Sequence, residues 1–378
     1  MKIALVVDDL IQNGGQERLF CAISEIWPEA PIYTSVASDT WKKHFYKKGV
    51  EIITSGIQKL PYVIQLSRYY SPFLVQVIAF ESFDFKGFDA VLSISSRFAH
   101  FVKTRPETLH ICYMNSPGRM FWESPDYFES ENYGLLRPVK FLAKPFLSLP
   151  LQLLRVADYV SAQKIDHVVA NSRYSQNKVS KYYKRNSEVI YPFVDVTGTK
   201  IAVQTKSPKP FFLVVTRLAA WKKVDIAVEA CTELGLNLKV VGGGPDLNRL
   251  KKMAGSTIEF LGPAPDTEKH SLLANCSVLI QTQREDFGVV PLEAMAYGKP
   301  VIAFNYGGTK ETVIDGVTGT FFDEQSSACL KKVLAEFDAS LYDPEKCIAR
   351  AKQFSRKEFK ENIQSYVQKA LEKSRRYT

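Results

Sequence analysis

The second half of the chain alternates short apolar runs with amphipathic segments, and this pattern constrains the fold more than any other feature. The apolar runs have the length of buried strands, and the segments between them have helical periodicity. We predict strands at six runs: FFLVVT, LKVVG, IEFLG, SVLIQT, PVIAF and GTFF. Strands that alternate with helices form a parallel sheet with both faces covered. Residues 211–355 are therefore predicted to form a doubly wound α/β domain.

The first half has the same alternation, with predicted strands at KIALVV, PIYTSV, DAVLSIS, LHICYM and DHVVAN. A length of 378 residues favours two domains over one. We predict a first α/β domain over residues 1–196 and, where the chain turns polar and loses periodicity, a linker over 197–210. The charged amphipathic helix at 356–378 follows the last strand, and we expect it to pack back on the first domain.

We predict helices between the strands of the second half, at 222–234, 246–253, 268–275, 291–297, 309–314 and 326–337. Two such sheets that face each other would form a cleft lined by the carboxyl ends of their strands. Ligands of open parallel sheets bind at those ends. We therefore look for the functional residues just after the predicted strands.

Composition narrows the class of protein. Hydrophobic residues make up 46% and charged residues 24% of the chain, as in ordinary globular proteins. The six cysteines are scattered without a CxxC pair, which argues against a disulfide framework and favours a reducing compartment. The five histidines show no metal-binding spacing, so we predict no metal site.

No secretory leader or membrane-spanning segment is expected. The longest apolar stretch, from Phe141, is interrupted by Lys144, Pro145 and Pro150. Residues 137–188 carry ten Lys and Arg against three Asp and Glu, within a net charge of +9. This basic region is either a solvated face or a surface that docks on an anionic membrane, where each basic residue contributes about 1 kcal/mol. No motif supports nucleic-acid binding.

Two acids and two bases in the second half form the strongest candidate site. Glu285 and Glu293 are separated by seven residues, while Arg217 and Lys222 follow the run FFLVVT. Carboxylates accept hydrogen bonds from sugar hydroxyls, and cations neutralise phosphate oxygens. Alone, Glu293 would be a helix-stabilising residue, since Pro291 at the first helical position would place it in the first turn. Together, the four residues predict a site for a sugar and a diphosphate.

Glycines near predicted strand ends could offer backbone N–H groups to phosphate. The candidates are Gly14, Gly15, Gly243, Gly288 and Gly308. Plain turns are the alternative explanation for each of them. The segment GGGP lacks the third glycine of a dinucleotide fingerprint, and no acid lies about twenty residues on, which disfavours a nicotinamide dehydrogenase.

Several segments resemble the family 4 retaining glycosyltransferases, over nearly the whole chain. They are GGQERL, NSRYSQNKV, VIYPFVDV, TRLAAWKKVD, VVGGGPDLNRL, EDFGVVPLEAMAYGKPVIA and NYGGTKETVIDGVTG. The combination of Glu-x7-Glu with Arg-x4-Lys is highly specific. LHICYMNSPGRMFW and YPFVD are most similar to the lipopolysaccharide O-antigen mannosyltransferases.

The resemblance implies the GT-B fold, a nucleotide-sugar donor, retention of anomeric configuration and no metal or other cofactor. It implies that Arg217 and Lys222 bind the donor diphosphate, Glu285 the transferred sugar and Glu293 the ribose, with Gly15 as a backbone donor to phosphate. GDP-mannose is the expected donor, and a UDP-sugar is the alternative. The departing phosphate could itself accept the proton of the acceptor, so no dedicated base is required.

One position departs from the family pattern. Asn115, in MNSPGR, stands where relatives usually have histidine. An asparagine can hydrogen-bond a sugar hydroxyl but cannot carry a proton at neutral pH. Three explanations are open. The histidine of the relatives does not act in acid–base chemistry, or this protein catalyses its reaction more slowly, or it uses a different donor. Arg119 could bind an acceptor phosphate or form a structural ion pair.

The leading hypothesis is an enzyme that moves a hexose to a lipid-linked glycan at the inner face of the cytoplasmic membrane, with peripheral membrane contact. One rival is a non-catalytic sugar-nucleotide-binding scaffold subunit, which only Asn115 supports. Another is a sugar-nucleotide epimerase of the same fold. The sequence leaves the donor base, the sugar epimer, the acceptor and the linkage open.

Overall fold

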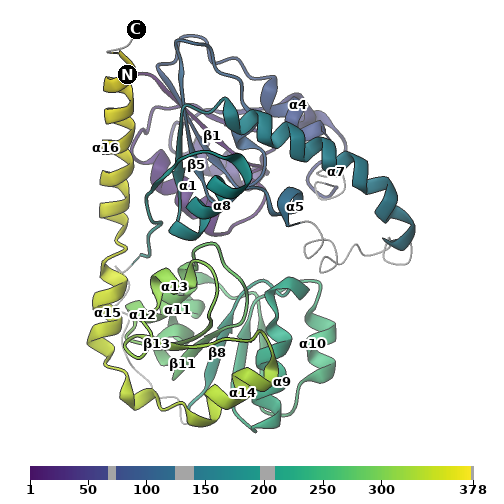
Figure 1. Cartoon of the computed structure of the whole chain (residues 1–378), viewed down its shortest axis with the longest axis vertical. Helices are drawn as coiled ribbons and strands as arrows, with labels where there is room; N and C mark the ends of the chain where they lie inside the picture. The colour runs from purple at the N-terminus through teal and green to yellow at the C-terminus, as the bar shows by residue number, and fades with distance from the viewer. Residues whose placement is uncertain (67–73, 124–139, 196–208, 376–378) are drawn as a thin grey trace. The chain divides into compact units, whose positions relative to one another are not determined.

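The computed structural model describes residues 1–66, 74–123, 140–195 and 209–375 (Figure 1). These residues form two compact units. The first unit contains residues 1–66, 74–123, 140–191 and 357–375, and the second contains 192–195 and 209–356. Of the predicted linker at 197–210, all but the last two residues lie outside the described part of the chain.

The first unit is built on a seven-stranded sheet in the order β3-β2-β1-β4-β5-β6-β7, and every pairing is parallel. Its strands are β1 (Ile3–Val7), β2 (Ile32–Thr34), β3 (Ile52–Thr54), β4 (Ala90–Ser95), β5 (Leu109–Met114), β6 (His167–Ala170) and β7 (Glu188–Val189). All residues of β1, β4 and β5 are buried, because these central strands are covered on both faces.

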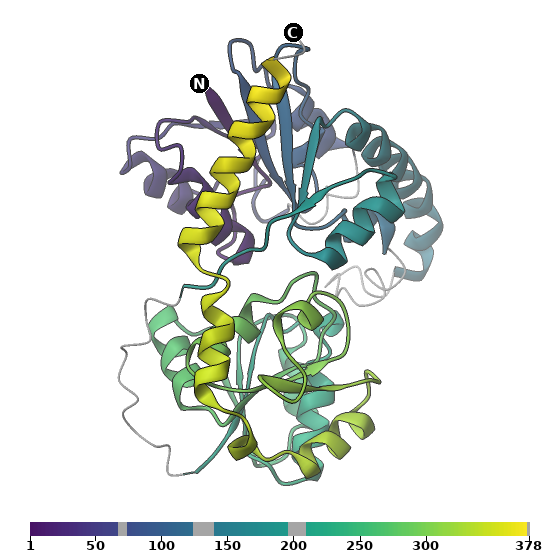
Figure 2. The same cartoon turned by 60° about the vertical axis from the view of Figure 1, so that its left-hand side comes forward.

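The helices of the first unit connect these strands. They are α1 (Gly15–Ser24), α2 (Asp39–Tyr46), α4 (Val75–Glu81), α5 (Arg119–Trp122), α7 (Lys140–Gln163), α8 (Arg173–Tyr183) and the short 3-10 helices η1 (Gly56–Lys59) and η2 (Ala99–Phe101). The C-terminal helix α16 (Arg356–Arg375) joins this unit and runs along it (Figure 2). It buries Phe359, Ile363 and Val367, and the Phe359 ring meets Tyr113 edge-on at 6.0 Å.

The second unit is built on a six-stranded parallel sheet in the order β10-β9-β8-β11-β12-β13. Its strands are β8 (Phe212–Val215), β9 (Leu238–Val241), β10 (Ile258–Gly262), β11 (Val278–Gln281), β12 (Val301–Phe304) and β13 (Gly319–Phe322). All six lie within the predicted apolar runs. The two parallel α/β domains predicted from the sequence are thus confirmed.

The helices of the second unit are α9 (Val224–Glu233), α10 (Leu247–Met253), α11 (Asp266–Asn275), α12 (Val289–Ala296), α13 (Thr309–Thr312), α14 (Ser327–Glu336), α15 (Pro344–Lys352), η5 (Ala220–Lys222) and η6 (Ala339–Leu341). The predicted start of α12 is wrong by two residues. Gly288 caps this helix with a φ of 90°, a left-handed conformation that glycine adopts without strain. Pro291 is therefore the third helical residue, and Glu293 lies beyond the first turn.

In both sheets the strand order reverses at one place: between β1 and β4 in the first unit and between β8 and β11 in the second. The loops after these strands diverge to opposite sides of the sheet, so the carboxyl ends of the strands are left open to a ligand. We call these two places the switch points of the sheets, and several candidate site residues lie in the loops that follow their strands.

Helix α7 continues through Pro150 as one helix of 24 residues. Among the described residues, no helix combines the length and the apolar character needed to cross a bilayer.

Candidate active site

Lys222 and Glu285 meet at the switch point of the second unit. Lys222 ends η5 just after β8, and Glu285 lies in the loop after β11. Lys222 Nζ is 2.5 Å from Glu285 Oε1, and both side chains are largely buried. The predicted cation and sugar-binding carboxylate are therefore in direct contact. An ion pair this sheltered is screened by water less than a surface pair.

Neighbouring groups fix the ion pair. The Thr282 hydroxyl donates to the Lys222 carbonyl at 3.0 Å, which ties the loop after β11 to η5. Gln283 Nε2 donates to Glu285 Oε1 at 3.1 Å. Lys222 Nζ also lies 4.2 Å from the centre of the Trp221 ring, within range of a cation–π interaction. The positive and negative groups are thus held by contacts within the protein.

Gly308 supports the Glu285 loop from the neighbouring strand end. Its N–H donates to the Glu285 carbonyl at 2.9 Å, so in this conformation it is engaged by protein rather than free for a phosphate. A Cβ at Gly308 would lie 2.1 Å from the Asp286 carbonyl oxygen. This close approach explains the glycine independently of ligand binding. Gly288, the cap of α12, follows the same loop.

Glu293 lies on α12 and pairs with a residue that the sequence analysis did not select. Lys269 Nζ on α11 is 2.8 Å from Glu293 Oε1, and both side chains are buried. Asp266 approaches the same ammonium at 3.7 Å. The predicted ribose ligand is therefore paired with a lysine of the protein. Breaking this pair would leave a buried charge, so Lys269 has a structural role at least.

Arg217 lies exposed in the loop after β8. The glycine segment after β9 packs against this loop: Leu218 N donates to the Gly243 carbonyl at 2.9 Å. Gly242 and Gly244 have φ values of 136° and 158°, and a Cβ on either would lie within 2.2 Å of a carbonyl oxygen of the loop after β8. Close packing of two strand ends thus accounts for this segment. It also positions Arg217 at the carboxyl edge of the sheet.

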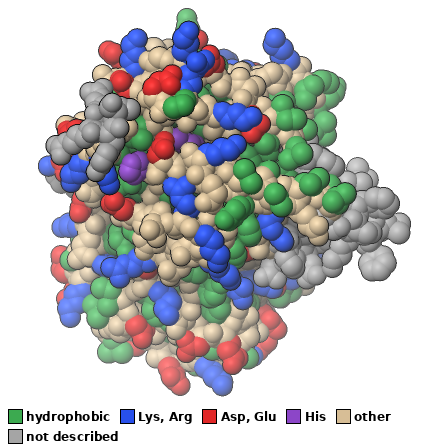
Figure 3. Space-filling model, turned by 45° about the horizontal axis from the view of Figure 1, so that its top comes forward, with side chains coloured by type: hydrophobic (Ala, Val, Ile, Leu, Met, Phe, Trp, Pro, Cys, Tyr) green, Lys and Arg blue, Asp and Glu red, His purple; other side chains and the backbone are tan. Residues whose placement is uncertain are grey.

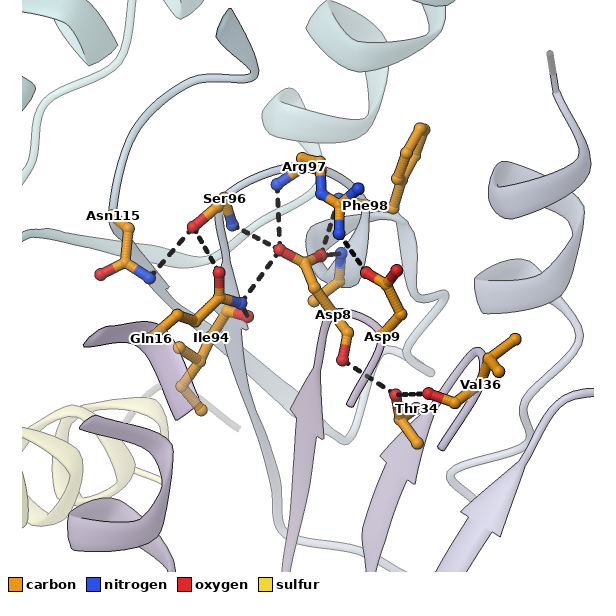
Figure 4. Close-up of polar contacts among 11 residues, drawn as sticks. Asp8, Asp9, Gln16, Thr34, Val36, Ile94, Ser96, Arg97, Phe98 and Asn115 are labelled. Carbon is orange, nitrogen blue, oxygen red and sulfur yellow. Dashed lines mark hydrogen bonds and ion pairs between the residues drawn. The ribbon is translucent and has the colours of Figure 1, made fainter. Parts of the chain in front are cut away.

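A buried carboxylate organises the switch point of the first unit (Figure 4). Asp8 follows β1, is 2% exposed, and lies opposite the loop after β4. Its two oxygens accept hydrogen bonds of 2.7 to 3.1 Å from the backbone N–H groups of four consecutive residues: Ser96, Arg97, Phe98 and Ala99. Gln16 Nε2 donates to the same carboxylate at 3.1 Å. Asp8 therefore fixes the loop after β4 and the start of α1 together.

Asn115 joins this network. Its Nδ2 donates to the Ser96 hydroxyl at 3.2 Å, and that hydroxyl donates to Gln16 Oε1 at 2.7 Å (Figure 4). Gln16 is the second residue of α1, so Asn115 is linked to the helix start that carries Gly14 and Gly15. The Gly14 N–H is capped by Glu17 Oε2 at 2.9 Å, while Gly15 is exposed. Three predicted residues of the first unit are thus brought together.

Arg119 begins the short helix α5 directly after the Asn115 loop and is half-buried. The same loop is anchored by a buried lysine: Lys178 Nζ donates to the Ser116 hydroxyl at 3.0 Å and pairs with Glu123 at 2.6 Å. The backbone before Arg119 is therefore held from α8.

Sequence reasoning missed Asp8, Arg97 and Lys269. Arg97 forms an ion pair with Asp9, whose pKa is raised by burial while the Arg97 guanidinium opposes the shift. One signal was available for Asp8, since an acid directly after a buried strand is unusual in a core position. The partners of these acids lie far along the chain, and the sequence does not reveal them.

The described residues contain no group of three or more His, Cys, Asp or Glu side chains arranged to hold a metal ion. All six cysteines are free.

Part of the chain is similar to known proteins. Residues 198–354 match the family model described as glycosyl transferases group 1. The second unit thus resembles a glycosyl transferase domain. A similar protein is an uncharacterized glycosyltransferase of Methanocaldococcus jannaschii, 32% identical over 45% of this chain and 49% of its own length.

The alpha-1,3/1,6-mannosyltransferase ALG2 is also similar. The human protein is 30% identical over 54% of this chain and 59% of its own length. The Saccharomyces cerevisiae protein is 28% identical over 71% of this chain and 64% of its own length. The chain matches between about half and two thirds of the length of these relatives.

Solved structures show the fold. Anabaena Alr3699/HepE in complex with UDP has a TM-score of 0.70 at 20% identity and covers 98% of this chain and 100% of its own. Sucrose-phosphate synthase from Thermosynechococcus elongatus has a TM-score of 0.70 at 15% identity, with coverages of 98% and 99%. The predicted GT-B fold is confirmed.

Proposed function

We propose that the chain is a retaining glycosyltransferase that moves a hexose from a nucleotide sugar to a glycan acceptor. The Lys222–Glu285 ion pair at the switch point carries this proposal. It places a cation and a carboxylate side by side in the segment that matches glycosyl transferases group 1. A diphosphate needs the first group and a sugar hydroxyl needs the second.

The pair would exchange partners when donor binds. Lys222 would move from Glu285 to a phosphate oxygen, and the released carboxylate would accept hydrogen bonds from the hexose. Arg217, exposed after the same strand, would add a second cation on the diphosphate. Charge develops on the diphosphate as the glycosidic bond breaks, and preorganised cations stabilise it there. Glu293 would exchange Lys269 for ribose hydroxyls in the same way.

We propose mannose from GDP-mannose as the transferred sugar, without a metal ion. The mannosyltransferases among the similar proteins support the sugar. A UDP-sugar is the alternative donor, because a solved structure of the same fold contains UDP. A thermal-shift screen with GDP-, UDP- and ADP-sugars identifies the base, because a bound donor raises the melting temperature by mass action.

The acceptor that we propose is a lipid-linked glycan in the synthesis of cell-surface polysaccharide, O-antigen in the most specific form. The enzyme would act peripherally at the inner face of the cytoplasmic membrane. The basic excess over residues 137–188 supports an acceptor with an anionic diphosphate anchor.

Release of nucleoside diphosphate from the preferred donor tests the proposal. We expect the wild-type chain to release nucleoside diphosphate slowly and the Glu285→Ala variant to release none. An isomerised donor without diphosphate release would instead identify an epimerase, and binding without any turnover would identify a scaffold.

A further inference from the structure

A buried carboxylate of α7 joins the segments that follow two neighbouring strands of the first unit. Asp158 is 0% exposed, and each of its oxygens lies against a polar group. Its Oδ1 is 3.0 Å from Nε2 of His100, which lies in η2 after β4. Its Oδ2 accepts a hydrogen bond of 2.7 Å from Nε1 of Trp122, the last residue of α5 after β5. One side chain therefore connects the far ends of two loops.

The contact with His100 extends to the end of β4. Asp158 Oδ1 and His100 Nε2 are both buried, and neither atom has a hydrogen-bond partner outside this contact in the described part of the chain. Because a carboxylate only accepts hydrogen bonds, Nε2 carries the proton and Nδ1 accepts from the Ser95 hydroxyl, 2.8 Å away. Ser95 is the last residue of β4. The position of η2 is thus tied to both α7 and the strand.

Two further residues of α7 hold the same two segments. Arg155, Asp158 and Ser161 are spaced by three residues, which places them on one side of the helix. Arg155 Nε donates to the Phe121 carbonyl of α5 at 2.8 Å, and the Ser161 hydroxyl donates to the His100 carbonyl at 3.0 Å. Helix α7 therefore holds the backbone of α5 at one turn and that of η2 two turns later, with Asp158 between them.

The other side of α7 faces solvent. Leu153, Val156 and Val160 are between 46% and 62% exposed. Hydrophobic side chains gather on the corresponding side of the molecule in Figure 3. The polar contacts of α7 with α5 and η2 are therefore on its inner side, and Asp158 cannot reach a ligand from there.

The two loops that Asp158 connects carry candidate site residues. The loop after β4 begins with Ser96, and the loop after β5 begins with Asn115 and leads into α5 at Arg119. Asn115 Nδ2 donates to the Ser96 hydroxyl at 3.2 Å, and that hydroxyl donates to Gln16 of α1 at 2.7 Å. The bond between Asn115 and Ser96 crosses from one loop to the other. Its length therefore depends on the separation that Asp158 sets between their far ends.

We propose that Asp158 is a positioning residue for sugar transfer, which fixes η2 and α5 so that Asn115 stays where it can hydrogen-bond a sugar hydroxyl. This role rests on the proposed function. It passes through His100 and Trp122, since Asp158 itself touches no substrate. A displacement of about 1 Å at a reacting group can lower a rate about a hundredfold. Removal of Asp158 should therefore slow diphosphate release by at least about tenfold.

Donor binding should not change with the rate. The predicted donor ligands Lys222, Glu285 and Glu293 belong to the second unit, whereas Asp158 and its partners belong to the first. Asp158→Ala should therefore keep the thermal shift of the wild-type chain with GDP-mannose while it releases diphosphate more slowly. A residue that only stabilises the fold would not separate these two quantities.

Three variants of the full chain test the contact by diphosphate release from GDP-mannose, measured well below the melting temperature. Asp158→Ala removes both partners, and Trp122→Phe keeps the ring but removes the N–H donor, so both should release more slowly. Asp158→Asn should retain most of the release. Its amide oxygen accepts from Trp122, and its NH2 group donates to His100 Nε2 once the imidazole proton moves to Nδ1.

Val367→Ala is the matched control for stability. Val367 lies on α16, is 1% exposed, and makes part of the core of the first unit. Its truncation should lower the melting temperature, as cavities do, and leave diphosphate release at the wild-type rate.

Hydrogen exchange of the two loops gives a second measurement that needs no activity. In Asp158→Ala, residues 96–101 and 115–122 should exchange at least about tenfold faster relative to β1 than in the wild-type chain. In Val367→Ala the ratio should be that of the wild-type chain.

Unchanged exchange in both loops of Asp158→Ala would overturn the positioning, whatever the chain catalyses. Wild-type release by both Asp158→Ala and Trp122→Phe would overturn it as well. An equal loss of release in Val367→Ala would show that Asp158 acts through stability alone. If the wild-type chain releases no diphosphate from GDP-, UDP- or ADP-sugars, the proposed sugar transfer itself fails, and the exchange of the loops separates that failure from a failure of the positioning.

Discussion

The contact between Lys222 Nζ and Glu285 Oε1 leads to the first prediction at the scale of single residues. Glu285→Gln keeps the size of the side chain and its oxygen acceptor but removes the charge. Hydrogen bonds to an ionised carboxylate are about twice as strong as neutral ones. The variant should therefore lower diphosphate release from the donor by about a hundredfold.

The exposed Glu324→Gln in the same unit provides the matched control and should release diphosphate at the wild-type rate. Equal rates in Glu285→Gln and wild type would remove Glu285 from the reaction.

Asp8 leads to a prediction of stability. Its carboxylate accepts four backbone N–H groups and one amide N–H, so Asp8→Asn would turn an NH2 group toward donors. Leaving buried donors unsatisfied costs about 1–3 kcal/mol, and more for charged groups. Urea unfolding should show a loss of at least about 2 kcal/mol.

Asp84→Asn, which breaks an exposed pair with Arg105 in the same unit, should change stability by less than about 1 kcal/mol. Similar losses in both variants would contradict the role given to Asp8.

Predictability at this scale depends on distance along the chain. Lys222 and Glu285 were selected because each follows an apolar strand, and the structure joins them across 63 positions. Asp8 and its backbone donors are 88 to 91 positions apart, and a backbone N–H leaves no signature in the sequence. Lys269 was missed because an isolated lysine on a helix resembles any surface lysine.

At the scale of elements, Gly308 holds the end of β12 against the Glu285 loop. A Cβ there would meet the Asp286 carbonyl oxygen at 2.1 Å and Phe287 Cα at 2.4 Å. Gly308→Ala should push the loop away, reduce stability by about 1–3 kcal/mol, as overpacking does, and reduce diphosphate release. Thermal unfolding and the release assay measure the two effects.

Gly56→Ala is the control, since its Cβ would have no atom within 4 Å. The account of Gly308 would be contradicted if both alanine variants retained wild-type stability.

The strands were predictable because buried parallel strands are nearly continuous apolar runs. The boundaries of the helices were less predictable. The start of α12 was misplaced because proline commonly occupies the first helical position, whereas here Gly288 is the cap and the helix begins at Val289, two residues before Pro291. Only the φ of 90° reveals this, and local sequence does not determine it.

At the scale of the whole molecule, the free energy of unfolding should depend on pH because of His110, a buried residue of the first unit. Burial lowers the pKa of His110 to about 3 from an ordinary 6.5. Between these values the unfolded chain binds a proton that the folded chain does not. Stability should therefore fall as the pH falls from 6.5 toward 3, by up to about 1.4 kcal/mol per pH unit from this residue.

Urea unfolding at pH 7 and pH 5 measures this slope. His110→Gln should reduce the pH dependence, even if it also loses the hydrogen bond with Ser93 and is less stable at both values. An unchanged slope would show that His110 is not the group that titrates.

The fold of the whole molecule followed from alternation of strands and helices in both halves, which the two sheets repeat. The GT-B fold itself came from motif resemblance and not from periodicity. Donor and acceptor specificity did not follow, because specificity rests on a few hydrogen bonds in loops that periodicity does not determine.

Calorimetric titration of the full chain with GDP-mannose, and with UDP- and ADP-sugars in parallel, tests most directly whether the Lys222–Glu285 pair opens to receive a donor diphosphate. Lys222→Met should weaken donor binding by at least about tenfold, because it removes a charge-assisted contact to phosphate. The neighbouring, exposed Lys223→Met should bind like wild type. Binding of no nucleotide sugar by the wild-type chain, or equal affinities in Lys222→Met and wild type, would contradict the account.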